Sequence, residues 1–95
     1  MIEATDQGGR VVEPIEWANA VAVRDAGVAL VMQGEREEVL IDMSAVAANS
    51  IAIAVVVSWL GVARQHKRKV QLTNLSDEFI DVIEFSGMAE LFRAA

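Results

Sequence analysis

The sequence contains no cysteine and only one histidine among its 95 residues. Without cysteine, a disulfide framework and every cysteine-ligated metal site are excluded. A single histidine also leaves too few imidazoles for most histidine zinc sites. We therefore expect neither a metal nor a cofactor.

Positive charge is scarce as well, since eight Lys and Arg face fourteen Asp and Glu and leave a net charge of −6. Such a chain repels phosphate backbones and anionic headgroups, so we expect no nucleic-acid partner. The basic cluster in residues 64–69 fits the solvated end of a helix, with contact to an anion or a partner as the alternative.

Targeting and membrane signals are also lacking. The first residues have no basic segment followed by an apolar one, as a signal peptide would. Residues 45–63 are uncharged, but their strongly apolar part, 51–60, is too short to cross a bilayer. We expect a cytoplasmic protein without direct membrane insertion, peripheral to the inner membrane only through a partner.

Strand-like and helix-like segments alternate along the chain. The pattern predicts a hairpin at the N-terminus, then three helices alternating with two further strands, and a last turn or two. The expected segments are strands 1–5, 10–13, 39–43 and 70–73, a turn at 6–9, helices 17–33, 50–65 and 76–87, and a final turn in 88–92. This order predicts one α/β domain over residues 1–95, with a small mixed sheet of about four strands and three to four helices.

The expected helix 50–65 is unusual because it is apolar nearly all round. One stripe is the predicted core face, formed by Ile53, Val56, Val57 and Leu60. Further apolar residues project in other directions, namely Ile51, Ala54, Val55, Trp59 and Val62. A small domain covers one side of such a helix, so the other side is expected to be an exposed docking patch. Coverage within the monomer, or by a homodimer, is the alternative.

Two residues at the start of this helix, Asn49 and Ser50, are both good N-caps. Ser50 can serve as the cap. Alternatively, it is a phosphate acceptor, because free N–H groups and the helix dipole stabilise added negative charge. The residues alone leave both roles open.

Several motifs in residues 39–92 together resemble the STAS domain family, named after sulfate transporters and anti-sigma-factor antagonists. The first are Ile41-Asp-Met-Ser44 and Asn49-Ser-Ile-Ala-Ile53, followed by the long apolar helix. The basic helix end, an apolar strand, the turn Asn74-Leu75 and a short helix ending at Gly87 continue the resemblance. With Ala52, Trp59 and the Asn-Leu turn, the chain is most similar to MlaB-type subunits of phospholipid-trafficking ABC transporters.

This resemblance implies a SpoIIAA-like fold and a non-catalytic accessory subunit that binds the transporter's ATPase. The surface it implies comprises Asn49, Ser50, Ile51, Ala52, Ala54, Val55 and Trp59. The alternative is an anti-sigma factor antagonist, which the kinase that is also its partner phosphorylates on Ser50. Asn49 and Ala52 stand where the family commonly has aspartate and glycine, which favours constitutive docking over the switch.

No set of residues in the sequence forms a convincing catalytic constellation, so we expect no enzyme. Asp42 at a strand end is expected to accept hydrogen bonds from the following loop. His66 is expected to be exposed, and the acidic residues of helix 76–87 to lie on a solvated face. Trp17 and Trp59 are both expected to be core or part-core residues.

Overall fold

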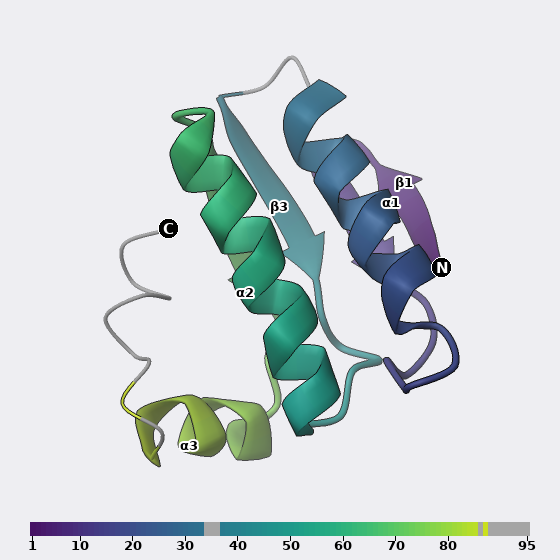
Figure 1. Cartoon of the computed structure of the whole chain (residues 1–95), viewed down its shortest axis with the longest axis vertical. Coiled ribbons are helices and arrows are strands. Elements are labelled where there is room, and N and C mark those ends of the chain that lie inside the picture. Colours follow the sequence, from purple (N-terminus) through teal and green to yellow (C-terminus); the bar gives the residue numbers. More distant parts are fainter. Residues whose placement is uncertain (34–36, 86, 88–95) are drawn as a thin grey trace.

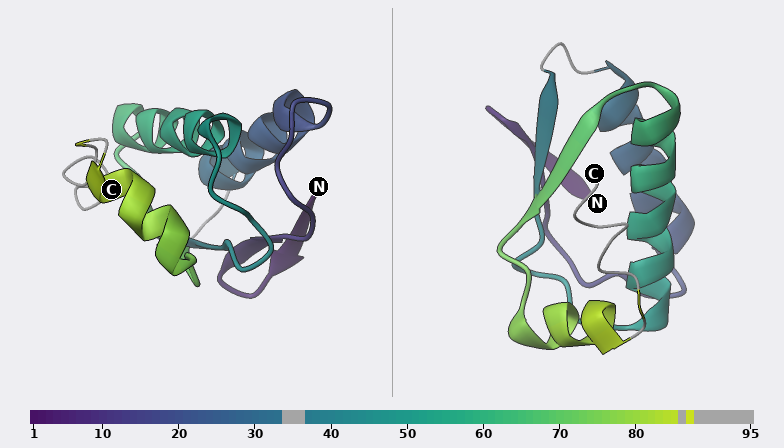
Figure 2. Two further views of the ribbon diagram at one scale, coloured as in Figure 1. Left: turned by 90° about the horizontal axis from the view of Figure 1, so that it is seen from below. Right: turned by 90° about the vertical axis from the view of Figure 1, so that its left-hand side faces the viewer.

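Two helices cover one face of a four-stranded sheet in the computed structural model, and a third helix lies across one end of the sheet (Figures 1 and 2). The structure describes residues 1–33, 37–85 and 87. The elements are β1 (Ile2–Thr5), β2 (Gly8–Val11), α1 (Ala20–Gln33), β3 (Glu38–Asp42), α2 (Ser50–Gln65), β4 (Lys69–Thr73) and α3 (Asp77–Phe85). The predicted STAS-like α/β fold with a small mixed sheet is confirmed.

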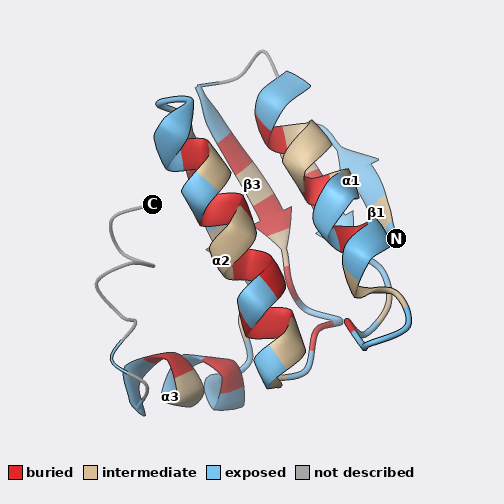
Figure 3. Cartoon of the chain, in the orientation of Figure 1, coloured by how far each residue is buried: buried red, intermediate tan, exposed pale blue. Residues whose placement is uncertain are grey.

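The sheet has the strand order β1-β2-β3-β4. β1 and β2 form an antiparallel hairpin, whereas β2, β3 and β4 run parallel. Parallel neighbours require crossover connections, and α1 and α2 supply them. Both helices lie on the same face of the sheet (Figure 2), and Figure 3 marks buried residues along β3 and along both helices.

The predicted turn at residues 6–9 is wrong in its second half, because Gly8 and Gly9 belong to β2. Gly8 has a φ of +155°, and a Cβ atom there would lie 2.2 Å from the carbonyl oxygen of Leu40. The glycine therefore serves the close approach of β2 to β3, and the hairpin turns over Asp6 and Gln7 instead. β2 also ends at Val11, two residues before the predicted end.

The first helix begins at Ala20, three residues later than predicted. The side chain of Asn19 holds the preceding loop in place. Its Oδ1 accepts a hydrogen bond from the Glu16 amide, and its Nδ2 donates one to the Pro14 carbonyl, both at 2.8 Å. These bonds keep Trp17 in a loop rather than in the helix.

The two apolar sides of α2 face two different elements. One side packs on the sheet through Val56 and Leu60, which are buried as predicted. The other faces α1, where the Trp59 ring lies against Gly27. The Trp59 Nε1 donates a hydrogen bond to the Arg24 carbonyl at 3.0 Å, and the side chain is 0% exposed. Coverage within the monomer therefore explains much of the helix's apolar surface.

The last helix, α3, begins as predicted. The Ser76 Oγ accepts a hydrogen bond from the Phe79 amide at 3.1 Å, which makes Ser76 its N-cap. Gly87 follows with a φ of +78°, a conformation that favours glycine. The predicted final turn in 88–92 lies outside the described residues. Within the described part of the chain, no helix is long and apolar enough to span a bilayer.

Candidate functional site: a groove between the first two helices

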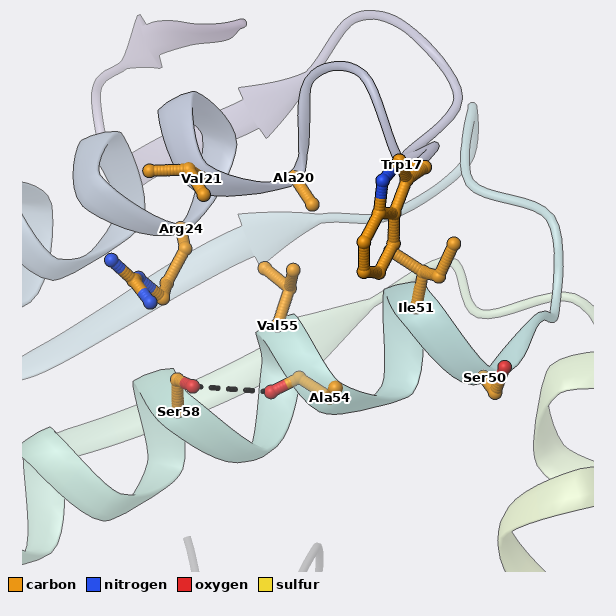
Figure 4. A pocket seen from close by; sticks show the side chains of 9 residues that line it. All are labelled: Trp17, Ala20, Val21, Arg24, Ser50, Ile51, Ala54, Val55 and Ser58. Carbon is orange, nitrogen blue, oxygen red and sulfur yellow. Dashed lines mark hydrogen bonds between the residues drawn. The ribbon is translucent and has the colours of Figure 1, made fainter.

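The N-terminal ends of α1 and α2 form a groove of ≈ 380 Å³ (Figure 4). We call this surface the docking groove. It is lined by Trp17, Ala20, Val21, Arg24, Ser50, Ile51, Ala54, Val55 and Ser58. Most of these side chains are apolar, so the groove is suited to an apolar group of a partner.

The rim of the docking groove exposes large apolar side chains. Trp17 is 84% exposed and Val21 is 62% exposed. Figure 4 shows the Trp17 ring reaching from its loop toward Ile51 of α2. The prediction that Trp17 belongs to the core is therefore wrong, because the Asn19-ordered loop holds it outside the helix layer. A tryptophan left in water at the edge of a groove is typical of an interaction site.

Val55 forms the floor of the groove and Arg24 provides its charge. Val55 is only 4% exposed, whereas the neighbouring Ala54 is exposed. The Ser58 hydroxyl donates to the Ala54 carbonyl at 3.2 Å. The Arg24 guanidinium lies 3.1 Å from the Asp25 carboxylate, an exposed ion pair that a partner's carboxylate could replace at little cost.

Asn49 caps α2, which settles one of the roles left open by the sequence. Its Oδ1 accepts a hydrogen bond from the Ala52 amide at 2.7 Å. Its Nδ2 donates to the Ile15 carbonyl at 3.1 Å and so ties the helix start to the segment after β2. Ser50 is therefore not the cap. It is the first residue of the helix, exposed at the end of the docking groove.

The residues predicted for partner binding are divided by the structure into two groups. Ser50, Ile51 and Ala54 line the groove, and Asn49 lies half-buried beside it. Val55 also lines the groove, but as a buried residue of its floor, and Ala52 and Trp59 are buried without lining it, which corrects the expectation that these three belong to an exposed patch. Ala52 points into the core, while Val55 and Trp59 face α1.

Trp17 and Val21 were not among the predicted binding residues, although they are the most exposed apolar side chains of the groove. Both lie in the segment predicted as helix 17–33, and Trp17 was expected to be a core or part-core residue. The signal that could have found them is the loop residue Asn19 between them, because a helix that starts after Asn19 leaves Trp17 outside the packed layer.

Replacing Asn49 tests its bridging role. Asn49→Asp keeps an acceptor for the Ala52 amide but replaces the donor to the Ile15 carbonyl with an oxygen that repels it. We expect Asn49→Asp to lower the free energy of unfolding by about 1–2 kcal/mol, measured by urea titration. An aspartate that matches the wild type in stability would show that the Ile15 bond contributes nothing.

The described residues contain no group of three His, Asp or Glu placed to hold a metal ion. Asp42 accepts a hydrogen bond from the Ser44 amide at 2.9 Å, which confirms its predicted role in the loop. This backbone bond is the main reason that the pKa of Asp42 is lowered, with the side chains of Ser44 and Asn74 and the charge of Arg10 adding to it. His66 is exposed at the end of α2, as predicted.

Comparison with known proteins identifies a family. The family model described as "Mlab, STAS domain" matches residues 10–93, which include both sides of the docking groove. No curated protein matches the chain.

Proposed function

Since the chain belongs to the family of MlaB-type STAS domains, we propose that it is a non-catalytic binding module for the ATPase subunit of a lipid-transport ABC transporter. The ATPase would bind in the docking groove. The observation that carries the proposal is the pair of apolar side chains on the groove's rim, Trp17 and Val21, left exposed beside the first turn of α2. Such an accessory subunit would be cytoplasmic and would reach the inner membrane through its partner.

The energetics of the rim favour docking. A tryptophan side chain buries roughly 150–250 Å² on contact, and apolar burial yields about 25 cal/mol per Å². Covering Trp17 would therefore release roughly 4–6 kcal/mol before ordering costs. Tryptophan is also among the residues that most often dominate binding energy. Among the large apolar side chains of the described residues, only Phe85 of α3 is more exposed.

The experiment is affinity co-purification from the native host with a matched pair of variants on α1. Val21 and Met32 are both exposed apolar residues of this helix, but only Val21 lines the docking groove. We expect wild type and Met32→Glu to recover the ATPase. Val21→Glu should recover at least about tenfold less ATPase, because a charge facing an apolar partner surface costs more than about 1.4 kcal/mol of binding free energy.

Two outcomes would contradict the proposal. Equal recovery of the ATPase with Val21→Glu and Met32→Glu would exclude the docking groove as the contact. Recovery of a sigma-regulating kinase and no transporter subunit would exclude the transporter role. Circular dichroism of each purified variant verifies that loss of binding does not reflect unfolding.

One observation favours the second candidate, an anti-sigma factor antagonist switched at Ser50. Because Asn49 caps α2, the hydroxyl of Ser50 is exposed and is not needed as the cap. A phosphate on Ser50 would lie near free amides at the helix start and would add negative charge beside the docking groove. In the same co-purification, a recovered kinase together with phosphate on Ser50 in the mass spectrum would favour this candidate.

A further inference from the structure

The docking groove runs along α1 and α2 rather than across them. Its lining residues on α2 extend from Ser50 to Ser58, and those on α1 extend from Ala20 to Arg24. On α2 they recur at intervals of three or four residues, as residues on one face of a helix do. At a rise of about 1.5 Å per residue, the α2 wall is roughly 12 Å long, or about two helical turns. The groove therefore fits an elongated segment that lies along both helices.

The walls of the groove offer such a segment few backbone partners. Past the first turn of a helix, the backbone N–H groups are bonded within the helix itself, and both walls are helices. An extended segment would bring its own N–H and C=O groups against apolar side chains, where an unpaired polar group costs free energy. A helix has already paired its backbone groups and presents only side chains. The walls therefore favour a helical occupant over an extended one.

The groove is positively charged, in a part of the chain that is otherwise nearly uncharged. Residues 20–33 and 45–63 hold only two charged side chains, Arg24 and Asp25. Of the described residues that line the groove, only Arg24 is charged. The N-terminal ends of both helices, which are the positive ends of their dipoles, lie at the same groove (Figure 4). The groove is thus opposite in sign to the chain as a whole, whose net charge is −6, and it complements an acidic group of a partner.

The guanidinium of Arg24 has donors left for a second carboxylate. Its Nε and Nη2 atoms both donate to the same oxygen, the Oδ1 of Asp25, at 3.3 and 3.1 Å. Arginine carries five N–H donors in a planar fork, and a carboxylate can accept two of them in parallel. The pair with Asp25 is exposed, so its exchange for a better-placed carboxylate costs little. Figure 4 shows the Arg24 side chain extending from α1 toward α2 at one end of the groove.

We propose that the docking groove receives an amphipathic helix of the ATPase subunit, with one carboxylate of that helix bound to Arg24; this assignment rests on the proposed function, which makes the ATPase the partner. The apolar side chains of the helix pack between Trp17 and Val21, over the Val55 floor. A carboxylate about one turn further along replaces Asp25 and accepts two N–H groups of Arg24. The apolar contacts supply the affinity, and the ion pair fixes the register of the helix in the groove.

Two matched charge reversals test the ion pair. The probe is the purified ATPase subunit from the native host, and its affinity for the immobilised full chain is measured by biolayer interferometry. Arg24→Glu and Arg64→Glu change the net charge equally, and both arginines are exposed on helices, but only Arg24 lines the groove. We expect Arg24→Glu to bind at least about tenfold more weakly, because it sets like charges against each other, and Arg64→Glu to bind like the wild type. Arg24→Glu should fold, since Trp59 bonds to the backbone carbonyl of residue 24, and circular dichroism verifies this.

Cross-linking identifies the segment that lies in the groove. A water-soluble carbodiimide joins a lysine amine to a carboxylate in contact with it, and it does not couple arginine. In Arg24→Lys, we expect a cross-link from position 24 to an Asp or Glu of the ATPase that has apolar residues three, four and seven positions away. Arg64→Lys is the control and should give no such product. Lys67 and Lys69 are present in both variants, so their products serve as an internal reference.

A charge exchange gives a readout that a purely structural role of Arg24 would not produce. The ATPase is prepared with lysine in place of the acidic residue that the cross-link identifies. This ATPase should bind the wild-type chain weakly, because two cations then meet, and it should bind Arg24→Glu about as well as the two unaltered proteins bind each other.

Three results would overturn the inference. If the ATPase binds Arg24→Glu as tightly as Arg64→Glu, no carboxylate of the ATPase pairs with Arg24, although the proposed function stands because the ATPase still binds. A cross-link to a segment without apolar residues at helical spacing excludes a helical occupant. A cross-link from position 24 to α3 of a second copy makes the groove a site of self-association. An ATPase that does not bind the wild-type chain contradicts the proposed function, and the inference with it, before any variant is compared.

Discussion

Gly27→Ala is expected to destabilise the protein by about 1–3 kcal/mol, although alanine is the better helix former by about 0.8–1.0 kcal/mol. A Cβ atom at position 27 would lie 2.1 Å from the Cε2 and Nε1 atoms of Trp59. The ring cannot retreat freely, because it is fully buried and its Nε1 bonds to the Arg24 carbonyl. Either α1 moves away from α2 or Trp59 leaves its position, and both disturb the largest buried side chain of the core.

Gly61→Ala is the matched control, because Gly61 also lies inside a helix but a Cβ atom added there would meet nothing within 4 Å. At position 61 only the higher helix propensity of alanine acts, and we expect Gly61→Ala to stabilise the protein by about 0.5–1 kcal/mol. Thermal unfolding followed by circular dichroism measures both, since about 1 kcal/mol shifts the midpoint by roughly 4–8 °C in a domain of this size. Shifts of the same sign in the two variants would show that Trp59 does not constrain Gly27.

Much of this fold could be predicted because its signals are local. β3 is a short apolar segment between polar residues, and Asn49, Ser50 and Ser76 are typical of helix starts. Each such signal acts over a few residues, so the order of strands and helices follows from the sequence. The alternation of strand and helix after the hairpin then favours parallel pairing of β2, β3 and β4 through crossovers.

The features that the sequence did not predict depend on contacts between distant residues. Gly27 lies inside the predicted helix 17–33, and its missing side chain makes room for Trp59, which is 32 positions away. Gly8 suggested a turn, but it lets β2 approach Leu40 of β3. No local pattern distinguishes a glycine that ends an element from one that accommodates a neighbour.

The docking groove was predicted only in part for the same reason. Helix periodicity shows that α2 has two apolar sides but does not show which one α1 covers. Trp17 and Trp59 were both expected in or near the core, yet only Trp59 joins the helices, while Trp17 is exposed at the rim. The start of α2 was located correctly because its capping residue lies next to it.

Two adjacent residues on α2 are expected to give opposite results when each is changed to aspartate. Val55→Asp places a carboxylate where the side chain is 4% exposed, in a core cluster that contains no charged residue. Burying an unpaired charge costs several kcal/mol, a large fraction of the roughly 5–15 kcal/mol that stabilises a small domain. We expect Val55→Asp to be largely unfolded at neutral pH, as judged by circular dichroism.

Ala54→Asp should fold, because Ala54 is exposed on the wall of the docking groove. Its carboxylate stays in water in the free protein and loses that water only when an apolar partner covers the groove, so the cost falls on binding. We expect at least about a tenfold loss of partner recovery with little change in stability. A folded Val55→Asp protein that fails to bind would instead place Val55 on the surface, and α1 would then not cover this side of α2.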